Sequence, residues 1–190
     1  MPDASNTYRL IGIDPGTNVM GYAIIEVRGR ELRLMSLDVV RMNRQYDHAH
    51  KLAQIVEELG KILDRHRPRQ LAIEAPFYGK NIQSMLKLGR AQGVAMATAL
   101  TRGIEIAEYS PRKIKQAITG NGNASKEQVA ALLGQILKQD LGAQTLDATD
   151  ALAVAVCHFF QQGRSGSPGA GSRYKGWKSF LKENPDRKSG

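Results

Sequence analysis

Three runs of apolar residues near the start of the chain have the pattern of β-strands. They cover residues 8–14, 19–27 and 31–40, and they are rich in β-branched side chains. The turn-forming segments Pro15-Gly16-Thr17-Asn18 and Arg28-Gly29-Arg30 separate them. Because short turns join strands that run in opposite directions, we expect an antiparallel meander at the start of the fold.

The chain then alternates between helical and strand patterns. Apolar residues recur at steps of three and four over residues 47–66, which predicts a helix that Pro68 ends. Residues 70–74 have the pattern of a short buried strand, residues 81–101 that of a long helix, and residues 104–109 that of another strand. This alternation is typical of parallel strands, so we expect a mixed sheet.

Three more helices are predicted in the C-terminal half. Ser110-Pro111 provides an N-cap and a proline at the first helical position of a helix that ends near Thr119. Ser125-Lys126-Glu127-Gln128 has the form of a capping box, and residues 147–161 form a strongly apolar last helix. The chain is therefore predicted to have an α/β fold, with a five-stranded mixed sheet flanked by helices.

The composition changes after residue 162. From Gly163 onward the chain is rich in glycine, serine and basic residues, and it has too few apolar side chains to form a core. We therefore expect one domain over residues 1–162 and a disordered basic tail over residues 163–190.

The charge of the chain favours a polyanionic partner. The 27 Lys and Arg residues against 18 Asp and Glu residues leave a net charge of +9, which suits nucleic acid or an anionic membrane. The N-terminus lacks the pattern of a secretory signal, and no segment is apolar over the length that spans a bilayer. We therefore expect a cytoplasmic protein without membrane association. Cys157, the single cysteine, is expected to be a buried apolar residue.

Four acidic residues lie at positions where a carboxylate is unexpected. Asp14 and Glu74 each end an apolar strand, while Asp147 and Asp150 lie three residues apart on one face of the last helix. Each alone has a structural explanation, because an aspartate can start a turn or cap a helix. If the four converge, their repulsion requires a cation, and hard ions such as Mg²⁺ suit an all-carboxylate site. Two such ions can promote the hydrolysis of a phosphodiester bond. This activity fits a basic protein, because nucleic acids are polyanions.

Three blocks of the sequence resemble the signature blocks of the RuvC family of Holliday junction resolvases, the crossover junction endodeoxyribonucleases. These blocks are Gly12-Ile13-Asp14-Pro15-Gly16-Thr17-Asn18 with Gly21-Tyr22-Ala23, then Ile73-Glu74-Ala75-Pro76-Phe77, and Asp147-Ala148-Thr149-Asp150-Ala151-Leu152-Ala153. They occur in the family's order over residues 8–162. The resemblance implies a ribonuclease H-like nuclease domain in which the first and fourth strands are adjacent and parallel.

The resemblance also implies the chemistry of the site. The four carboxylates are expected to bind two Mg²⁺ ions per active site, with Mn²⁺ as a substitute. Some relatives carry a histidine in the last pair, but Asp147 takes that place here, so we expect no histidine as general base. The four histidines, His48, His50, His66 and His158, are expected at the surface or at helix ends.

The activity implied is structure-selective cleavage of Holliday junctions by symmetric hydrolysis, during homologous recombination and DNA repair. Phe77 resembles an aromatic wedge that stacks on an unpaired base. Lys115 and Lys126 resemble lysines near the scissile phosphate, where they offset developing charge. For Phe77, burial in the core is the structural alternative, and for the lysines it is a solvated surface. Weaker candidates for contacts with the DNA backbone are Lys80, Asn81, Arg90, Arg112 and Lys113.

A homodimer is also expected, because two identical sites match a junction that is nearly two-fold symmetric. The helix over residues 81–101 is the predicted dimer helix, since it has more apolar and small surface than one sheet face needs. The residues of this surface are Met85, Leu88, Ala91, Gln92, Ala95 and Ala99. Branch-migration proteins of the RuvA and RuvB type are the further partners that the resemblance implies.

Three alternatives compete with this interpretation. Asp14-x-Gly16-Thr17 also resembles the first phosphate loop of actin-like ATPases, but those folds need a second related domain, and 190 residues without a repeat are too few. A ribonuclease H-like nuclease that processes structured RNA is a nearer alternative, against which residues 74–77 and the basic stretch 110–126 argue. A junction-binding protein without catalysis is hard to reconcile with four intact acidic positions.

Overall fold

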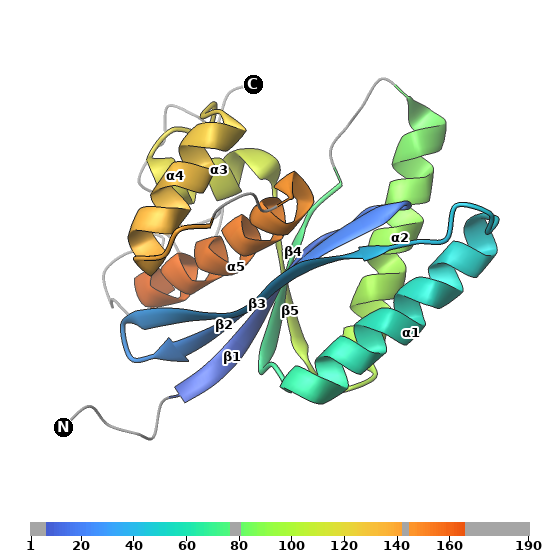
Figure 1. The fold of residues 1–190 in the computed structure, drawn as a ribbon, viewed down its shortest axis with the longest axis horizontal. Helices are drawn as coiled ribbons and strands as arrows, with labels where there is room; N and C mark the ends of the chain where they lie inside the picture. Colours follow the sequence, from blue (N-terminus) through green and yellow to red (C-terminus); the bar gives the residue numbers. More distant parts are fainter. Residues whose placement is uncertain (1–6, 77–80, 142–144, 166–190) are drawn as a thin grey trace, which may run out of the picture. The chain divides into compact units, whose positions relative to one another are not determined.

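A five-stranded sheet in the order β3-β2-β1-β4-β5 forms the centre of the fold (Figure 1). Its strands are β1 (Thr7–Asp14), β2 (Val19–Arg28), β3 (Glu31–Arg41), β4 (Gln70–Glu74) and β5 (Glu105–Tyr109). β1, β2 and β3 form an antiparallel meander, whereas β4 pairs in parallel with both β1 and β5. The mixed sheet predicted from the sequence is therefore confirmed.

The computed structural model describes residues 7–76, 81–141 and 145–165. Residues 1–159 form one unit, which holds the whole sheet. Of the second unit, residues 160–190, the structure describes residues 160–165, which are the end of the last helix.

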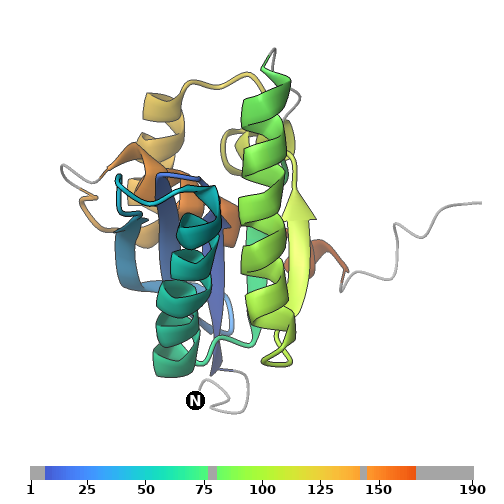
Figure 2. The same ribbon diagram turned by 90° about the vertical axis from the view of Figure 1, so that its right-hand side faces the viewer.

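Helices cover both faces of the sheet (Figures 1 and 2). They are α1 (His48–His66), α2 (Ile82–Leu100), α3 (Pro111–Thr119), α4 (Lys126–Leu137) and α5 (Leu146–Ser165). α1 and α2 pack against each other on one face, and α5 lies on the opposite face with α3 and α4 beside it. Because α5 continues to Ser165, the helix extends beyond residue 162, where the tail was predicted to begin. The rest of the predicted tail lies outside the described residues.

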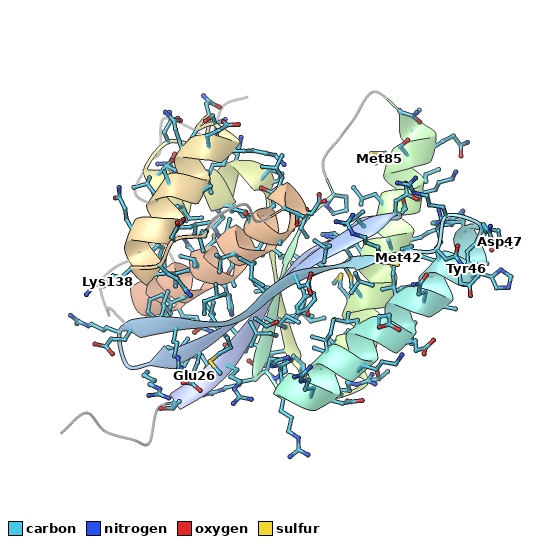
Figure 3. The ribbon with its side chains drawn as sticks, viewed as in Figure 1. Glu26, Met42, Tyr46, Asp47, Met85 and Lys138 are labelled. Atoms are coloured by element: carbon cyan, nitrogen blue, oxygen red, sulfur yellow. The ribbon has the colours of Figure 1, made fainter. Side chains whose placement is uncertain are left out.

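Side chains cap the N-termini of α1, α3 and α4, and the caps of α3 and α4 are the ones that the sequence indicates. The hydroxyl of Ser110 accepts a hydrogen bond from the backbone N–H of Lys113, and Ser125 and Gln128 form the reciprocal capping box of α4. Asp47, labelled in Figure 3, caps α1 in the same way. Within the described part of the chain, no helix is long and apolar enough to cross a membrane.

Small residues bring α2 close to the sheet and to α1. Ala91, Ala95 and Ala99 are buried in the aliphatic core between the sheet and these two helices, and Gln92 is buried beside them. Residues buried in the chain's own core are not available to a second subunit. The prediction that these four positions contribute to a dimer surface is therefore wrong.

Two glycines allow α5 to lie directly on the strands of the opposite face. A Cβ atom at Gly12 would lie 2.1 Å from the carbonyl oxygen of Ala151, and one at Gly21 would lie 2.0 Å from that of Asp147. No side chain fits at these distances, so the close approach of helix and sheet requires glycine at both positions. The helix that carries Asp147 and Asp150 is thereby held against β1, which carries Asp14.

Candidate active site

Two of the four predicted carboxylates lie at the same edge of the sheet. β1 and β4 are parallel neighbours, and Ile13 pairs with Ile73, so Asp14 and Glu74 are adjacent at the ends of the two strands. Ile13 and Ile73 belong to the core under α1 and α2. Because side chains alternate between the faces of a strand, Asp14 and Glu74 face α5 instead.

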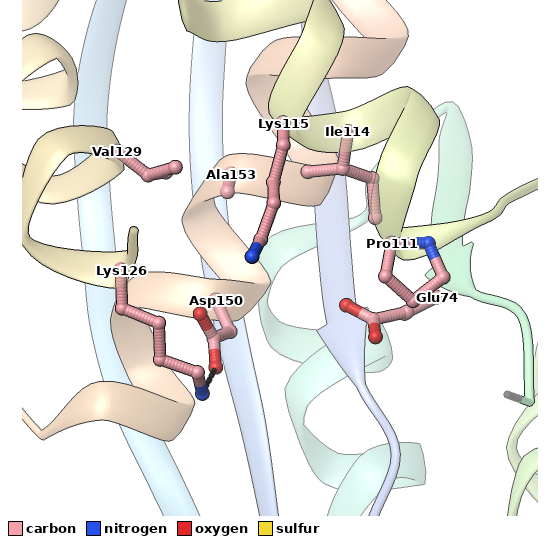
Figure 4. Close-up of a pocket in the computed structure, with 8 residues that line it drawn as sticks. All are labelled: Glu74, Pro111, Ile114, Lys115, Lys126, Val129, Asp150 and Ala153. Carbon is pink, nitrogen blue, oxygen red and sulfur yellow. Dashed lines mark hydrogen bonds and ion pairs between the residues drawn. The ribbon is translucent and has the colours of Figure 1, made fainter. Parts of the chain in front are cut away.

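Helix α5 provides the other two carboxylates. Asp147 lies in its first turn and Asp150 one turn later. Asp150 and Glu74 line a common pocket of about 310 Å³ (Figure 4). The pocket is completed by Pro111, Ile114, Lys115, Lys126, Val129 and Ala153. The structure thus brings together residues from β4, α3, α4 and α5 that are far apart in the sequence.

Burial and mutual repulsion act together on the two strand carboxyls. Burial raises the pKa of Asp14 to about 7, and the negative charges of Glu74, Asp150 and Asp147 add to the rise. Burial likewise raises the pKa of Glu74 to about 7, with a further contribution from Asp150. The cluster therefore holds more negative charge than its surroundings stabilise, which is the condition for binding a cation.

Two lysines partly offset this charge. The ammonium group of Lys126 forms an ion pair with the carboxylate of Asp150. Burial alone would lower the pKa of Lys126, but the hydrogen bond to Asp150 and the nearby carboxylates raise it above its ordinary value. Lys115 extends from α3 into the same pocket (Figure 4), and its charge opposes the rise in the pKa of Glu74.

The donor set suits a hard divalent cation, because it consists of carboxylates from rigid elements, two of which are largely buried. Within residues 7–76, 81–141 and 145–165, no three acidic, histidine or cysteine side chains already surround one metal position. Asp150 is instead turned toward Lys126. The ion pair involves Oδ2 of Asp150, so the other carboxylate oxygen can bind a cation while Lys126 stays in place.

Comparison with known proteins identifies the family. The family model described as "Crossover junction endodeoxyribonuclease RuvC" matches residues 10–158. The chain belongs to the RuvC family.

Relatives and solved structures agree with this membership. Proteins named crossover junction endodeoxyribonuclease RuvC from Cytophaga hutchinsonii and Porphyromonas gingivalis are each 52% identical to this chain. These matches cover 94% of the chain, and 86% and 95% of the two relatives. The structure of Thermus thermophilus RuvC in complex with a Holliday junction substrate matches with a TM-score of 0.78 at 30% identity. That match covers 83% of this chain and 96% of the other.

The yeast mitochondrial Holliday junction resolvase Ydc2 shares the fold, with a TM-score of 0.65 at 12% identity, over 83% of this chain and 80% of that one. The predicted ribonuclease H-like α/β fold is thus confirmed. As a RuvC family member, the chain is a crossover junction endodeoxyribonuclease, a hydrolase.

None of the weaker candidates for DNA contact that the structure describes lines the pocket. Phe77 and Lys80 lie outside the described residues. Asn81 caps α2, because its side-chain oxygen accepts a hydrogen bond of 3.0 Å from the backbone N–H of Ser84. Arg90 and Arg112 are exposed on α2 and α3. The ammonium group of Lys113 lies 5.0 Å from the centre of the Tyr109 ring.

Sequence analysis missed a buried polar pair between β5 and α5. The hydroxyl of Tyr109 and Nδ1 of His158 are 2.7 Å apart, and both residues are buried. The expectation that His158 lies at the surface or at a helix end is wrong, because α5 continues past it and packs this face toward β5. His158 follows Asp150 by about two helical turns, so the two side chains lie near the same side of α5. This spacing was the signal in the sequence that His158 faces the protein. Cys157 is buried as predicted.

Proposed function

We propose that this RuvC family member resolves Holliday junctions by metal-dependent hydrolysis of DNA phosphodiester bonds, in homologous recombination and DNA repair. The observation that carries the proposal is that Asp14, Glu74, Asp147 and Asp150, from three elements of the fold, lie close enough for their charges to interact. Family membership and the junction complex of a relative with the same fold support the substrate. No comparable observation favours an actin-like ATPase or an RNA-processing nuclease.

Magnesium is the proposed cofactor, with two ions per active site and Mn²⁺ as a substitute. Asp14, Glu74, Asp147 and Asp150 would hold the ions. Bound there, the metal would stabilise the attacking and leaving oxygens of an in-line displacement at phosphorus. The raised pKa values of Asp14 and Glu74 support this assignment, since the buried cluster lacks sufficient positive charge of its own.

Lys115 and Lys126 are the proposed partners of the scissile phosphate. Both ammonium groups project into the pocket that Glu74 and Asp150 line. There they can donate hydrogen bonds to phosphate oxygens and offset the charge that develops during hydrolysis. Lys126 has a second role in this structure, because its ion pair holds Asp150 in place.

Other side chains would position the junction. Phe77 remains the proposed wedge, three residues after Glu74 in the chain. Arg112 is exposed on α3, the helix that also carries Lys115, so it can reach the DNA backbone beside the pocket. Further proposed backbone contacts are Lys80, Asn81 and Lys113.

A homodimer remains part of the proposal, with a revised surface on α2. Ile82 and Leu86 in the N-terminal half of the helix are 65% and 49% exposed. Leu86 lies in a hollow that Pro76, Met85, Gly89 and Arg90 also line. Two copies of this surface can pack around a two-fold axis. Branch-migration partners of the RuvA and RuvB type and a cytoplasmic location complete the proposal, as expected for an enzyme that acts on DNA like its bacterial relatives.

Cleavage of a synthetic four-way junction tests the proposed function. The protein should introduce paired nicks near the crossover when Mg²⁺ is present, and a linear duplex of the same sequence should stay intact. A chelator should stop the reaction, and added Mg²⁺ should restore it. Equal cleavage of both substrates, or cleavage in the chelator, would contradict the proposal.

A further inference from the structure

The sheet edge opposite the carboxylates carries a group of arginines. These residues, which we name the arginine edge, are Arg9, Arg65, Arg67, Arg69 and Arg102. They lie at the start of β1, at the end of α1 and in the connection to β4, and after the end of α2. Over residues 8–9, 64–70 and 100–105 the acidic residues are Asp64 and Glu105, and Glu26 of β2 adds a third negative charge beside Arg9. The edge therefore holds a clear excess of positive charge.

Hydrogen bonds show that these segments are neighbours in space. The guanidinium group of Arg9 donates to the backbone carbonyl of His66 over 3.0 Å. The backbone N–H of Arg69 donates to the carbonyl of Arg9 over 2.8 Å. Arg67 and Arg102 line a common hollow, together with Leu63, Asp64, Pro68 and Ile104. The segments that carry the five arginines are thus neighbours in space.

Two of the five arginines already have partners. Arg102 binds both carboxylate oxygens of Asp64, at 2.8 Å and 3.3 Å. Arg9 donates a hydrogen bond to the carbonyl of His66 and lies 3.9 Å from a carboxylate oxygen of Glu26. Burial lowers the pKa of His66, and the positive charges of Arg65 and Arg9 lower it further, so both of these arginines lie near His66. The edge has more positive charge than its own carboxylates neutralise.

The other three arginines are exposed and available to a ligand. Arg65, Arg67 and Arg69 are exposed, and in the described part of the chain no ion pair involves them. Arg67 ends α1 in a left-handed conformation, with its N–H bonded to the carbonyl of Leu63 at 2.8 Å. The guanidinium carbon of Arg69 lies 5.6 Å from the centre of the Tyr8 ring. Neither arrangement neutralises a charge.

The arginine edge and the candidate active site lie at opposite ends of the sheet. β1 runs from Arg9 to Asp14, roughly 17 Å along a strand. In Figure 1 the start of β1 and the end of α1 lie low in the picture, and the end of β4 lies in its upper half. DNA bound at the carboxylates therefore leaves the arginine edge facing away from it, open to another polyanion.

We propose that the arginine edge binds the phosphate backbone of a second DNA duplex while the carboxylate site holds a junction. The planar guanidinium group matches the geometry of phosphate oxygens. The apolar residues Leu63 and Ile104 of the hollow are buried, so they offer none of the exposed anchors that protein interfaces use. Contacts with phosphates need only charge and hydrogen-bond donors. The inference rests on the proposed function for the identity of the first ligand, the junction.

A capture experiment tests this second surface. The full-length protein is first saturated with an unlabelled four-way junction in a chelator, which prevents cleavage. A fluorescent linear duplex is then added, and its anisotropy reports binding. The variant with Arg65→Gln, Arg67→Gln and Arg69→Gln should capture the duplex at least tenfold more weakly than the wild type. For this variant, the slope of the logarithm of the binding constant against the logarithm of the salt concentration should be shallower by about 2 to 3 units, since three phosphate contacts are lost.

A control variant removes the same charge elsewhere. Arg30→Gln, Arg33→Gln and Lys138→Gln neutralise three exposed basic residues on the β2–β3 hairpin and after α4. This control should capture the duplex like the wild type. Melting temperatures of both variants establish that they are folded. The variant with Arg65→Lys, Arg67→Lys and Arg69→Lys should retain capture because it keeps the charge.

Three results would overturn the proposal. The junction-bound wild type could fail to capture the duplex, or the glutamine variant of the arginine edge could capture it normally. Alternatively, the edge could bind poly-glutamate but not DNA, which would make an acidic protein its partner. Junction cleavage with Mg²⁺ by the same glutamine variant should be unchanged at saturating enzyme. This readout separates failure of the second surface from failure of the proposed function.

Discussion

At the scale of single residues, the burial of Asp14 lowers the stability of the metal-free fold but favours the binding of a cation. Its burial beside three other carboxylates raises its pKa from an ordinary value of 3.8 to about 7, so its charged form destabilises the metal-free fold. The same burial places a strong oxygen ligand where a cation can neutralise the cluster. A residue that lowers stability in this way is expected at a functional site.

This conflict predicts that Asp14→Asn stabilises the metal-free protein at neutral pH. Because the folded state holds the proton more tightly than the unfolded state, the wild type loses stability as the pH rises from about 4 to about 7. In a chelator at pH 8, the variant should have a higher free energy of unfolding, by at most about 4 kcal/mol. The difference should disappear near pH 4, and added Mg²⁺ should stabilise the wild type more than the variant. Urea unfolding at both pH values measures this, and a less stable variant at pH 8 would contradict the account.

Phe77→Ala tests the proposed wedge, because an exposed stacking ring and a buried core ring predict different effects of the substitution. An exposed stacking ring predicts an unchanged melting temperature and slower cleavage of intact junctions, by about 1 to 3 kcal/mol in activation free energy. Junctions with unpaired bases at the centre should partly rescue the variant. A core ring predicts a loss of about 3 to 5 kcal/mol in stability without rescue. Melting and cleavage measured side by side decide between these outcomes.

At the scale of elements, the position of α5 on the sheet determines whether the carboxylates meet. Gly12 and Gly21 allow the helix backbone to contact β1 and β2, so the start of α5 lies beside the ends of β1 and β4. The sequence showed these glycines inside apolar strands but did not show which element would contact them.

Gly21→Ala should therefore disturb the site through the helix. The new Cβ would lie 2.0 Å from the carbonyl of Asp147, so α5 must move, at a cost of about 1 to 3 kcal/mol. Junction cleavage should fall and the Mg²⁺ concentration for half-maximal activity should rise. Gly93→Ala on α2 is the matched control, because its Cβ meets nothing within 4 Å and alanine favours a helix. Equal effects of the two substitutions on the Mg²⁺ requirement would refute this role of Gly21.

The elements could be predicted from sequence because local patterns specify them. β4 has the predicted bounds, and the capping signals at Ser110 and Ser125 mark the starts of α3 and α4. The four carboxylates stood out because each interrupts an apolar pattern. The ion pair of Lys126 with Asp150 could not be predicted, because it depends on how α4 and α5 pack in three dimensions. For the same reason, the alanines of α2 were assigned to a partner rather than to the core.

At the scale of the whole molecule, charge is distributed unevenly. The net charge is +9, yet one sheet edge gathers four carboxylates while the opposite edge gathers arginines. A chain with this distribution can attract DNA at long range and still concentrate negative charge where a metal is needed. The basic residues after residue 165 add to the attraction.

Removing residues 166–190 should thus weaken DNA binding without unfolding the core. This segment contains six Lys or Arg residues against two acidic ones, so the truncated protein should show a shallower salt dependence of duplex binding. Its melting temperature should stay within a few degrees of the full-length value, and it should still cleave junctions. A large drop in melting temperature would show that the segment, with Trp177 and Phe180, is part of the fold.

The most direct test of the central claim is junction cleavage by four single variants, Asp14→Asn, Glu74→Gln, Asp147→Asn and Asp150→Asn. Each substitution removes a proposed metal ligand, keeps the size of the side chain and relieves repulsion within the cluster. Each variant should bind the junction at least as tightly as the wild type and should cleave it several orders of magnitude more slowly with Mg²⁺. Nicking at the wild-type rate by any two of the variants would contradict the assignment of the four carboxylates as the metal site.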